Sequence, residues 1–417
     1  MAALKASVPK LKVLISGAGI AGPCLAYWLS RTRLNTSITV VERASAPRVS
    51  GQALDIHDSA IEVIKKMGLL HAVRSNSTAE EGTRFINSSG KAFADFMAPS
   101  HFTAEYEILR ADLSELFLKA TGHLSNVRYV YGKSVKSIEQ TDTEVNVAFS
   151  NGSKDTYDLF VSADGANSKT RSMILDTETL HNSWNPLGMY NAYFSIPRTP
   201  SDENLWQIYN IPKGRGIMVR PHRNGTTMGA YMTIATPARG VCDQGLDDAI
   251  SKGMDAAKEM LHERFNNAGW EAKRVLKGMD QAQDFYMSSA AQVRLSKWTN
   301  RRAVVLGDAA WATFGIGTTL AIEGAYTLAG EIGKIETTDD VPRALEKYEE
   351  VFRPIFVEKG DLPPGFPQFM FPQSWGLRVR NSILWAISTT GLHKLFSGHS
   401  DQNVIFKLPG HNWKSNV

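Results

Sequence analysis

The stretch Lys12-Val-Leu-Ile-Ser-Gly17-Ala-Gly19-Ile-Ala-Gly22 decides the fold of this chain of 417 residues. Its apolar start is typical of a buried strand, and the segment from Leu25 to Arg31 has the apolar spacing of a helix. The three glycines have distinct uses: the first permits a tight turn, the second lets backbone N–H groups approach a pyrophosphate, and the third lets helix and strand pack closely. The stretch therefore predicts a dinucleotide-binding βαβ unit.

An acidic residue completes this unit. The next β-branched run, from Ser37 to Val41, ends at Glu42, where a carboxylate accepts hydrogen bonds from ribose hydroxyls. An acid at this position favours a free 2′-hydroxyl, as in FAD or NAD, over NADP. The fingerprint alone does not separate FAD from NAD, and a chance glycine turn in an α/β protein remains the alternative.

The composition is that of an ordinary globular protein. Hydrophobic residues make up 43% and charged residues 21%, the net charge is +4 and the basic residues are dispersed, so we expect no nucleic-acid partner. Cys24 and Cys242 lie far apart, which argues against a disulfide framework and a zinc site. The chain has neither the pattern of a signal peptide nor an apolar run of about 20 residues. We expect a cytoplasmic protein, a monomer or homodimer, without stable membrane insertion and without a metal.

The chain changes character in its middle. From about Asn191 to Thr233, segments rich in Tyr, Trp and Met alternate with turns such as Pro212–Gly214 and Asn224-Gly225, which predicts an antiparallel sheet with a hairpin at Asn-Gly. A helix is expected from Asp247 to Asn266. The buried-strand pattern returns at Arg302–Leu306, and the Pro-rich stretch after Leu362 precedes a helical segment, Trp375–Thr389.

We therefore predict an α/β fold in which a Rossmann-like nucleotide-binding domain is interrupted by a β-rich insertion. The expected nucleotide-binding domain is discontinuous and comprises residues 1–75, 106–178 and 285–360. Residues 76–105 and 179–284 are assigned to the antiparallel-sheet substrate domain, and residues 361–417 to a C-terminal helical tail.

Three further segments distinguish FAD from NAD. Leu109-Arg110 places an arginine at the mouth of a helix, Asp164-Gly165 follows a strand, and Gly307-Asp308 joins a strand to a helix. With the glycine unit, these segments resemble the group A flavoprotein monooxygenases, the family typified by para-hydroxybenzoate hydroxylase. The nearest resemblance is to the tetracycline-inactivating hydroxylases and fungal secondary-metabolite hydroxylases. It extends from Gly17 to about Gly365.

The resemblance implies an FAD-binding domain of the para-hydroxybenzoate hydroxylase type and a specific chemistry. The expected enzyme uses NADPH and inserts one oxygen atom from O2, through a flavin C4a-hydroperoxide, into a hydrophobic aromatic or polycyclic small molecule of secondary metabolism. Because no second glycine fingerprint follows, NADPH is expected to visit the FAD-bound protein transiently. The tail helix is expected to pack onto the FAD domain; contact with a membrane through Trp385 and Ile387 is the alternative.

The resemblance also assigns cofactor contacts by position. Glu42 would hold the adenosine ribose, Arg110 the ribityl-phosphate region and Asp308 a ribityl hydroxyl. Asp164 and Gly165 would touch both FAD and NADPH, although they also suit an ordinary turn, and Arg110 also suits a helix-capping ion pair. The helix that begins near Gly317 would point its positive end at the flavin pyrimidine edge, which favours negative charge there by up to roughly 2 kcal/mol. The whole expected set is Gly17, Gly19, Gly22, Glu42, Arg43, Arg48, Asp55, Arg110, Asp164, Gly165, Gly307, Asp308, Gly315, Gly317, Thr318 and Thr319, with Arg48 and Arg171 toward NADPH and Asp55 close to the flavin ring.

Substrate contacts are expected from the middle sheet. Tyr193, Gln207 and Met228 would face the flavin. Arg220 or Tyr231 would polarise or deprotonate a phenol-like substrate, so Tyr193, Arg220 and Tyr231 are the catalytic candidates. Packing within the sheet is the alternative for each of them.

One departure from the family pattern concerns the loop after Gly307-Asp308. The family has His, a Pro and then Gly-x-Gly-x-Asn, whereas this chain has Trp311, a shorter run without Pro, and Thr319 in place of Asn. Because that loop borders the isoalloxazine, hydroxylation, epoxidation and Baeyer–Villiger insertion all stay open. A flavin oxidase or reductase without oxygen insertion is the alternative function. A non-catalytic lipid-binding protein related to the GDP dissociation inhibitors is a further one, although it gives no reason for Glu42, Arg110 and Asp308 to occur together.

Overall fold

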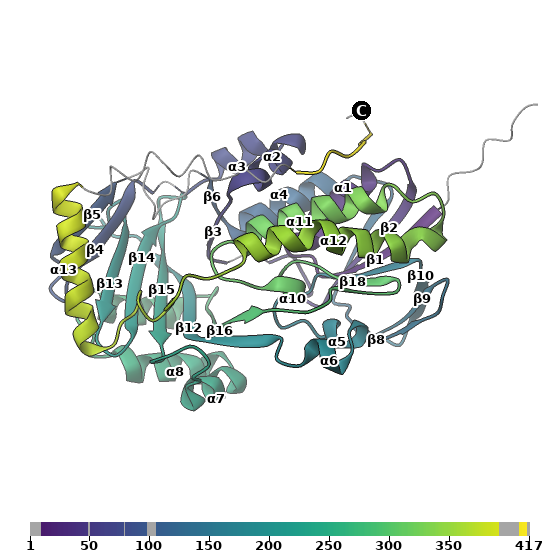
Figure 1. Cartoon of the computed structure of the whole chain (residues 1–417). Coiled ribbons are helices and arrows are strands. Elements are labelled where there is room, and N and C mark those ends of the chain that lie inside the picture. Colours follow the sequence, from purple (N-terminus) through teal and green to yellow (C-terminus); the bar gives the residue numbers. More distant parts are fainter. Residues whose placement is uncertain (1–9, 49–50, 79, 98–105, 392–407, 415–417) are drawn as a thin grey trace, which may run out of the picture.

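The computed structural model describes residues 10–48, 51–78, 80–97, 106–391 and 408–414. Two sheets with their helices lie side by side in an elongated molecule (Figure 1). None of the helices in these ranges is long and apolar enough to span a membrane. The predicted α/β architecture with an inserted sheet is confirmed.

The first sheet contains the glycine fingerprint. Its strand order is β17-β18-β11-β1-β2-β7, with all pairs parallel except β17–β18. The strands are β1 (Lys10–Ser16), β2 (Asn35–Glu42), β7 (Val127–Tyr131), β11 (Leu159–Ser162), β17 (Thr299–Asn300) and β18 (Ala303–Val305). β11 and β18 are buried along their whole length because both faces of the sheet are covered, which explains their unbroken apolar runs.

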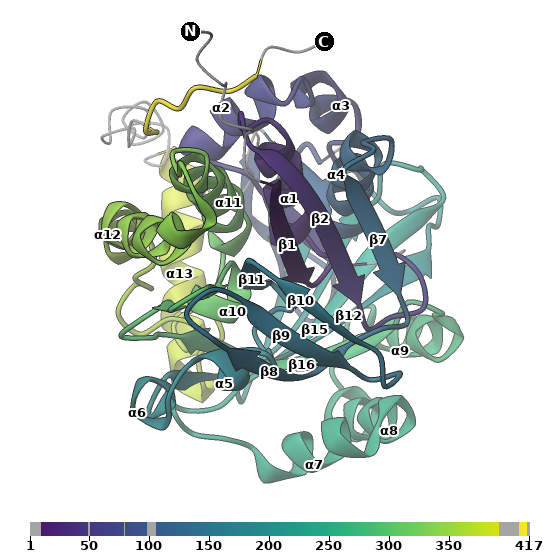
Figure 2. The ribbon, with the colours of Figure 1, turned by 90° about the vertical axis from the view of Figure 1, so that its right-hand side faces the viewer.

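Helices cover one face of this sheet and a small antiparallel meander covers the other (Figure 2). The meander is β8 (Val135–Gln140), β9 (Val145–Phe149) and β10 (Lys154–Tyr157). The helices are α1 (Ala21–Ser30), α4 (Arg110–Gly122), α11 (Gly317–Ile332) and α12 (Val341–Lys359). α11 packs on α1, so the helix that follows Asp308 lies beside the helix of the glycine fingerprint.

The second sheet has the order β16-β12-β15-β14-β13-β4-β5, and only β13 and β4 pair in parallel. Asn224-Gly225 lies in the β14–β15 hairpin, as predicted. The sheet also includes β16, which the expected boundary at residue 285 assigned to the nucleotide-binding domain. Its strands are β4 (Gly82–Ile86), β5 (Ala92–Met97), β12 (Trp184–Pro197), β13 (Trp206–Ile211), β14 (Arg215–Pro221), β15 (Thr227–Ala235) and β16 (Tyr286–Val293).

Helices α7 (Gln244–Lys252), α8 (Met254–Phe265) and α9 (Ala272–Gln281) cover one face of the second sheet. The single helix expected from Asp247 to Asn266 was wrong, because Gly253, with φ of 110°, separates α7 from α8. The tail helix α13 (Ser374–Thr390) packs against β5 of the second sheet and not onto the FAD domain, which corrects that expectation. Ile387 packs into the cluster on this sheet and Trp385 is exposed.

Short elements connect the two sheets. β3 (Ala53–Asp55) and β6 (Glu107–Leu109) pair with each other between them (Figure 1). The remaining elements are α2 (Asp58–Lys66), α3 (Leu70–Ser75), α5 (Arg171–Ile174), α6 (Thr177–Leu180), α10 (Asp308–Trp311) and the 3-10 helix η1 (Thr338–Asp340).

Candidate FAD and substrate site

Three distant segments meet at the N-terminus of α1. A β-carbon on Gly17 would lie 2.2 Å from the carbonyl oxygen of Ala163, so the glycine loop lies directly on the loop that contains Asp164-Gly165. A β-carbon on Gly307 would lie 2.9 Å from Cβ of Ala21, the first residue of α1. The convergence expected from the sequence is therefore present in the structure.

The glycine loop has the features of a pyrophosphate cradle. A β-carbon on Gly19 would meet nothing within 4 Å, which leaves open space beside the backbone. No side chain caps the N-terminus of α1, so its first N–H groups are available to an anion. Glu42 lies at the same loop, with Oε2 accepting from the N–H of Ala18 and Oε1 from that of Ala44, both at 3.0 Å.

Arginines gather beside this cradle. The N–H of Arg110 donates to the carbonyl oxygen of Gln52 at 3.0 Å, which fixes the start of α4 against the segment before β3. Partial desolvation, and then the charge of Arg110, lower the pKa of Arg48, so these two guanidinium groups lie close together. Arg43 is exposed at the end of β2. This positive concentration suits an anionic dinucleotide.

The carboxylate of Asp308 lies in an environment that suits a cofactor contact. Its carboxylate has no hydrogen-bond partner within the described ranges, and burial raises the pKa of Asp308 while the charge of Arg110 lowers it. A β-carbon on Gly317 would lie 3.1 Å from Oδ1 of Asp308, so the carboxylate lies at the start of α11. A half-buried acceptor without a partner fits a ligand hydroxyl.

The N-terminus of α11 is also open to a ligand. Ile316 provides no side-chain cap, and Thr318 is half-buried in the first turn. Thr319 is fully buried and its Oγ1 accepts from the N–H of His57 at 3.1 Å, so it joins α11 to the segment after β3. Gly315 lies in the exposed part of the preceding loop.

The Asp-Gly loop is held internally. Oδ1 of Asp164 accepts from the hydroxyls of Ser162, Ser168 and Thr170, and Oδ2 accepts from two backbone N–H groups of the same loop. Asp164 thus shapes the loop, and Gly165 presents open backbone. Nη1 of Arg171 donates to the carbonyl oxygens of Ala166 and Ala309 at 3.1 and 3.0 Å. Arg171 is buried, so it ties this loop to α10 and does not reach toward NADPH as expected.

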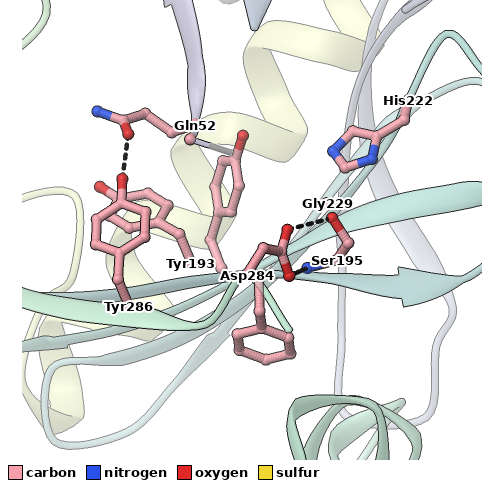
Figure 3. Close-up of a pocket in the computed structure, with 10 residues that line it drawn as sticks. Gln52, Tyr193, Ser195, His222, Gly229, Asp284 and Tyr286 are labelled. Carbon is pink, nitrogen blue, oxygen red and sulfur yellow. Dashed lines mark hydrogen bonds between the residues drawn. The ribbon is translucent and has the colours of Figure 1, made fainter. Parts of the chain in front are cut away.

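A pocket opens where the segment before β3 meets the second sheet (Figure 3). The ring of Tyr193 stacks on Tyr286 at 5.1 Å and meets Tyr231 edge-on at 5.0 Å. The hydroxyl of Tyr286 donates to Gln52. The pocket is lined by Gly51, Gln52, Tyr193, Phe194, Ser195, His222, Gly229, Tyr231, Asp284 and Tyr286.

Burial keeps these tyrosines neutral. Desolvation raises the pKa of Tyr193 and Tyr231, and it raises the pKa of Tyr286 to about 12. Near neutral pH each is therefore a phenol that can donate a hydrogen bond, and Tyr231 does not act there as an anionic base.

Two substrate candidates lie on the other face of the sheet. Met228 is buried in the cluster with α7, α8 and α9. Gln207 pairs directly with Val219, a member of the same cluster, so its side chain leaves on that face too. The expectation that Gln207 and Met228 face the flavin was wrong. Side chains alternate along a strand, and it is the residues next to these two that point to the pocket side of the sheet. Tyr193 and Tyr231 belong to the opposite face, with Ile208 and Met218.

Arg220 lies in a carboxylate cluster that sequence patterns did not indicate. Nη2 of Arg220 lies 2.7 Å from Oε2 of Glu80 and also contacts Glu107. Asp55 pairs with Glu107 across β3 and β6. Burial, and then Glu107, raise the pKa of Asp55. Glu80 and Glu107 stand in no recognisable motif: Glu107 lies on β6 and Glu80 in the loop before β4, and only the tertiary fold brings both to Arg220.

Trp311 is a core residue and does not line the pocket. It is fully buried, with its ring 4.7 Å from Trp298 and 5.1 Å from Phe352. The replacement of the family's His by Trp311 therefore extends the aromatic core beneath α11 and α12 rather than the wall of the site.

Comparisons with known proteins agree with this geometry. Residues 10–358 match the family model described as an FAD binding domain. The chain is 33% identical to monooxygenase CTB7 of Cercospora beticola over 96% of this chain and 98% of that protein. It is 34% identical to the flavin-dependent monooxygenase eupH of Phoma sp, over 89% of this chain and 91% of that protein. The crystal structure of tetracycline destructase Tet(51) superposes with a TM-score of 0.76 at 29% identity, covering 97% of this chain and all of that one.

Proposed function

Since this chain belongs to the FAD-binding-domain family of flavin-dependent monooxygenases, we propose that it uses NADPH and inserts one oxygen atom from O2 into a hydrophobic aromatic or polycyclic small molecule of secondary metabolism. One observation carries the proposal: Tyr193, Tyr231 and Tyr286 line a pocket against the segment whose Gln52 accepts from Arg110. An aromatic wall beside a dinucleotide cradle suits a flat apolar substrate. The polycyclic preference is supported by the name of the tetracycline destructase.

The cofactor contacts follow from the open donors and acceptors. The N–H groups of the Gly17–Gly22 loop and of α1 hold the pyrophosphate, and Glu42 holds the adenosine ribose. The carboxylate of Asp308 accepts from a ribityl hydroxyl, and Arg110 balances its charge. The uncapped N-terminus of α11, with Thr318, would hold the pyrimidine edge of the ring system. Bound FAD would pass the two electrons of NADPH to O2, so that one oxygen atom of O2 enters the substrate and the other leaves as water.

The second sheet supplies the substrate side. Tyr231 donates a hydrogen bond to a substrate oxygen, and the charge of Arg220 beside it stabilises negative charge that develops there. Tyr193 provides an aromatic face. Buried apolar side chains behind them keep water from the reacting groups; these are Phe85, Phe96, Ile208, Met218 and Phe371.

NADPH approaches from the exposed side of the arginines. Arg43 and Arg48 are exposed beside the cradle and attract its phosphates. Gly165 offers open backbone next to Asp164, whose backbone nitrogen lies against Gly17 of the glycine loop. We also propose that the enzyme is cytoplasmic and is a monomer or homodimer. Light scattering of the purified protein tests the oligomeric state.

The decisive experiment uses 18O2. The purified yellow protein is incubated under 18O2 with NADPH and a panel of phenols, quinones, indoles and polyketides. Mass spectrometry then measures the mass of each product. We expect a substrate that accelerates NADPH consumption and gains one labelled oxygen atom. Hydrogen peroxide as the sole oxygen product with every compound would overturn the proposal in favour of an oxidase.

A further inference from the structure

Arg220 is fixed by two acidic side chains from outside its own sheet strand. Its Nη2 and Nε donate to Oε2 of Glu80 at 2.7 and 3.0 Å, and Nη2 also contacts Oε1 of Glu107. Oε2 of Glu107 accepts from the hydroxyl of Thr78 at 2.7 Å. The side chains of Arg220, Glu80 and Glu107 are 7%, 2% and 5% exposed, so the guanidinium has no freedom to swing away.

The guanidinium lies against two aromatic rings of the second sheet, one of which lines the pocket. Its Cζ is 4.7 Å from the ring centre of Trp206 and 5.9 Å from that of Tyr231. Tyr231 is a wall of the pocket, and its hydroxyl accepts from the N–H of Ala53 at 3.3 Å. Tyr231 therefore lies between the cluster and the pocket, in contact with both.

The cluster holds more carboxyl groups than it has cations. Asp55 lies across from Glu107 and within reach of the charge of Arg220, so three carboxyl groups lie near one guanidinium and two of them contact it. Among the residues that the structure describes, the other titratable groups that face it are His57, next to β3, Tyr231 on β15, and His222, which follows β14. Three buried carboxylates with one guanidinium would carry surplus negative charge in a poorly hydrated place, which favours retention of a proton.

Of the three carboxyl groups, Glu80 has an oxygen atom that is free to carry this proton. Its Oε1 is buried and has no hydrogen-bond partner among the residues described. A carboxylate oxygen left bare in this way is costly, whereas a protonated one is neutral. Burial raises the pKa of Glu80 to about 7, although the Arg220 charge opposes the rise.

We propose that Glu80 is a positioning residue for the oxygenation reaction: it anchors Arg220 beside Tyr231 and carries one exchangeable proton that neutralises the surplus charge of the cluster. Release of this proton leaves Glu80 as a carboxylate and lowers the positive field at Tyr231, and uptake reverses the change. The inference rests on the proposed function for its link to oxygenation. Its structural part, a carboxyl group that titrates near neutral pH, stands apart from turnover.

The test is infrared spectroscopy of the FAD-loaded enzyme as pH is raised from acid to mildly alkaline. We expect the C=O band of a protonated carboxyl to disappear with a midpoint near neutral pH. The isosteric Glu80→Gln variant keeps an acceptor for Arg220 and is expected to lack this transition. The matched control is Glu203→Gln, which alters an exposed glutamate that also pairs with an arginine, Arg84, and which is expected to titrate like the wild type.

Activity gives the second readout. In Glu80→Gln, kcat for NADPH oxidation is expected to lose its dependence on pH near neutrality while KM for NADPH stays within twofold. A neutral-range band that persists in Glu80→Gln but vanishes in Asp55→Asn would overturn the assignment to Glu80. If Glu80→Gln does not fold, the wild type is compared with Asp55→Asn. A carboxyl band that titrates near neutral pH in both proteins supports the proposal. Absence of this band from the wild type overturns it. Failure of oxygen insertion with an intact band would count against the proposed function alone.

Discussion

Gly17 lies directly against the backbone of Ala163, so closely that a β-carbon at Gly17 would stand 2.2 Å from the Ala163 carbonyl oxygen. This contact joins the start of the chain's first βαβ unit to the end of β11, which lies far away in the sequence. Gly17 also has φ of 116°, a conformation that side chains rarely adopt. Gly19, in the same loop, has neither constraint.

Gly17→Ala and Gly19→Ala should therefore fail in different ways. Gly17→Ala is expected to destabilise the apoprotein by more than about 2 kcal/mol, because the loop must leave β11. Gly19→Ala is expected to change apoprotein stability by less than about 0.5 kcal/mol and still weaken FAD binding, because its methyl group enters the open cradle. Urea unfolding and quenching of FAD fluorescence measure the two effects. Equal FAD affinity for Gly19→Ala and the wild type would contradict the assignment of the pyrophosphate to this loop.

Asp308→Asn should separate stability from cofactor affinity. Burial raises the pKa of Asp308, so its ionised form costs folding free energy above that pKa and costs nothing at acid pH. The Asn variant of the apoprotein is therefore expected to be more stable than the wild type at neutral pH, by roughly 1–3 kcal/mol, with the difference shrinking as pH falls. FAD affinity is expected to drop about tenfold, a loss of about 1.4 kcal/mol. Thermal unfolding across pH, with and without FAD, measures both; a less stable apoprotein at neutral pH would contradict the reasoning.

Met228→Ala and Met218→Ala compare the two faces of the second sheet. Met228 packs under the helices, and Met218 packs on the opposite face of the sheet with Tyr231. Both truncations are expected to cost about 2–5 kcal/mol of stability. Only Met218→Ala is expected to change KM for the organic substrate, since the other cavity opens away from the site. A KM change confined to Met228→Ala would reverse the assignment of the faces.

Glu80→Gln should alter how stability depends on pH. The folded-state pKa of Glu80 is raised from 4.5 to about 7, so the wild type gains a destabilising charge as pH rises through that window, worth about 3 kcal/mol when complete. The variant lacks this charge, so its stability relative to the wild type is expected to increase from pH 4.5 to pH 7 and then level off. Denaturant unfolding at several pH values measures the slope. Glu203→Gln serves as control, and a flat difference for Glu80→Gln would contradict the titration.

Much of the fold could be predicted from local sequence patterns. The glycine fingerprint, the β-branched run that ends at Glu42 and the buried run before Asp308 each specify a strand and its turn through short-range geometry, and the structure places them as predicted. Their order along the chain indicated the inserted sheet, because a strand pattern interrupted and resumed implies a domain between. The helix after Asp243 was predicted as one piece because apolar spacing continues across Gly253 without a break.

The face that each strand residue presents came only from tertiary structure. Side chains alternate along a strand, so a shift of one residue moved Gln207 and Met228 to the helix-covered side, and both faces of this sheet are apolar enough to hide the difference. Glu80 and Glu107 belong to segments without a motif, and pairing of β6 with β3 brings Glu107 opposite Asp55 and near Arg220. The chain by itself determined the cradle for FAD, because backbone turns and helix ends are local. The surroundings of the substrate depend on strand register and on contacts between distant segments, which only the folded molecule decides.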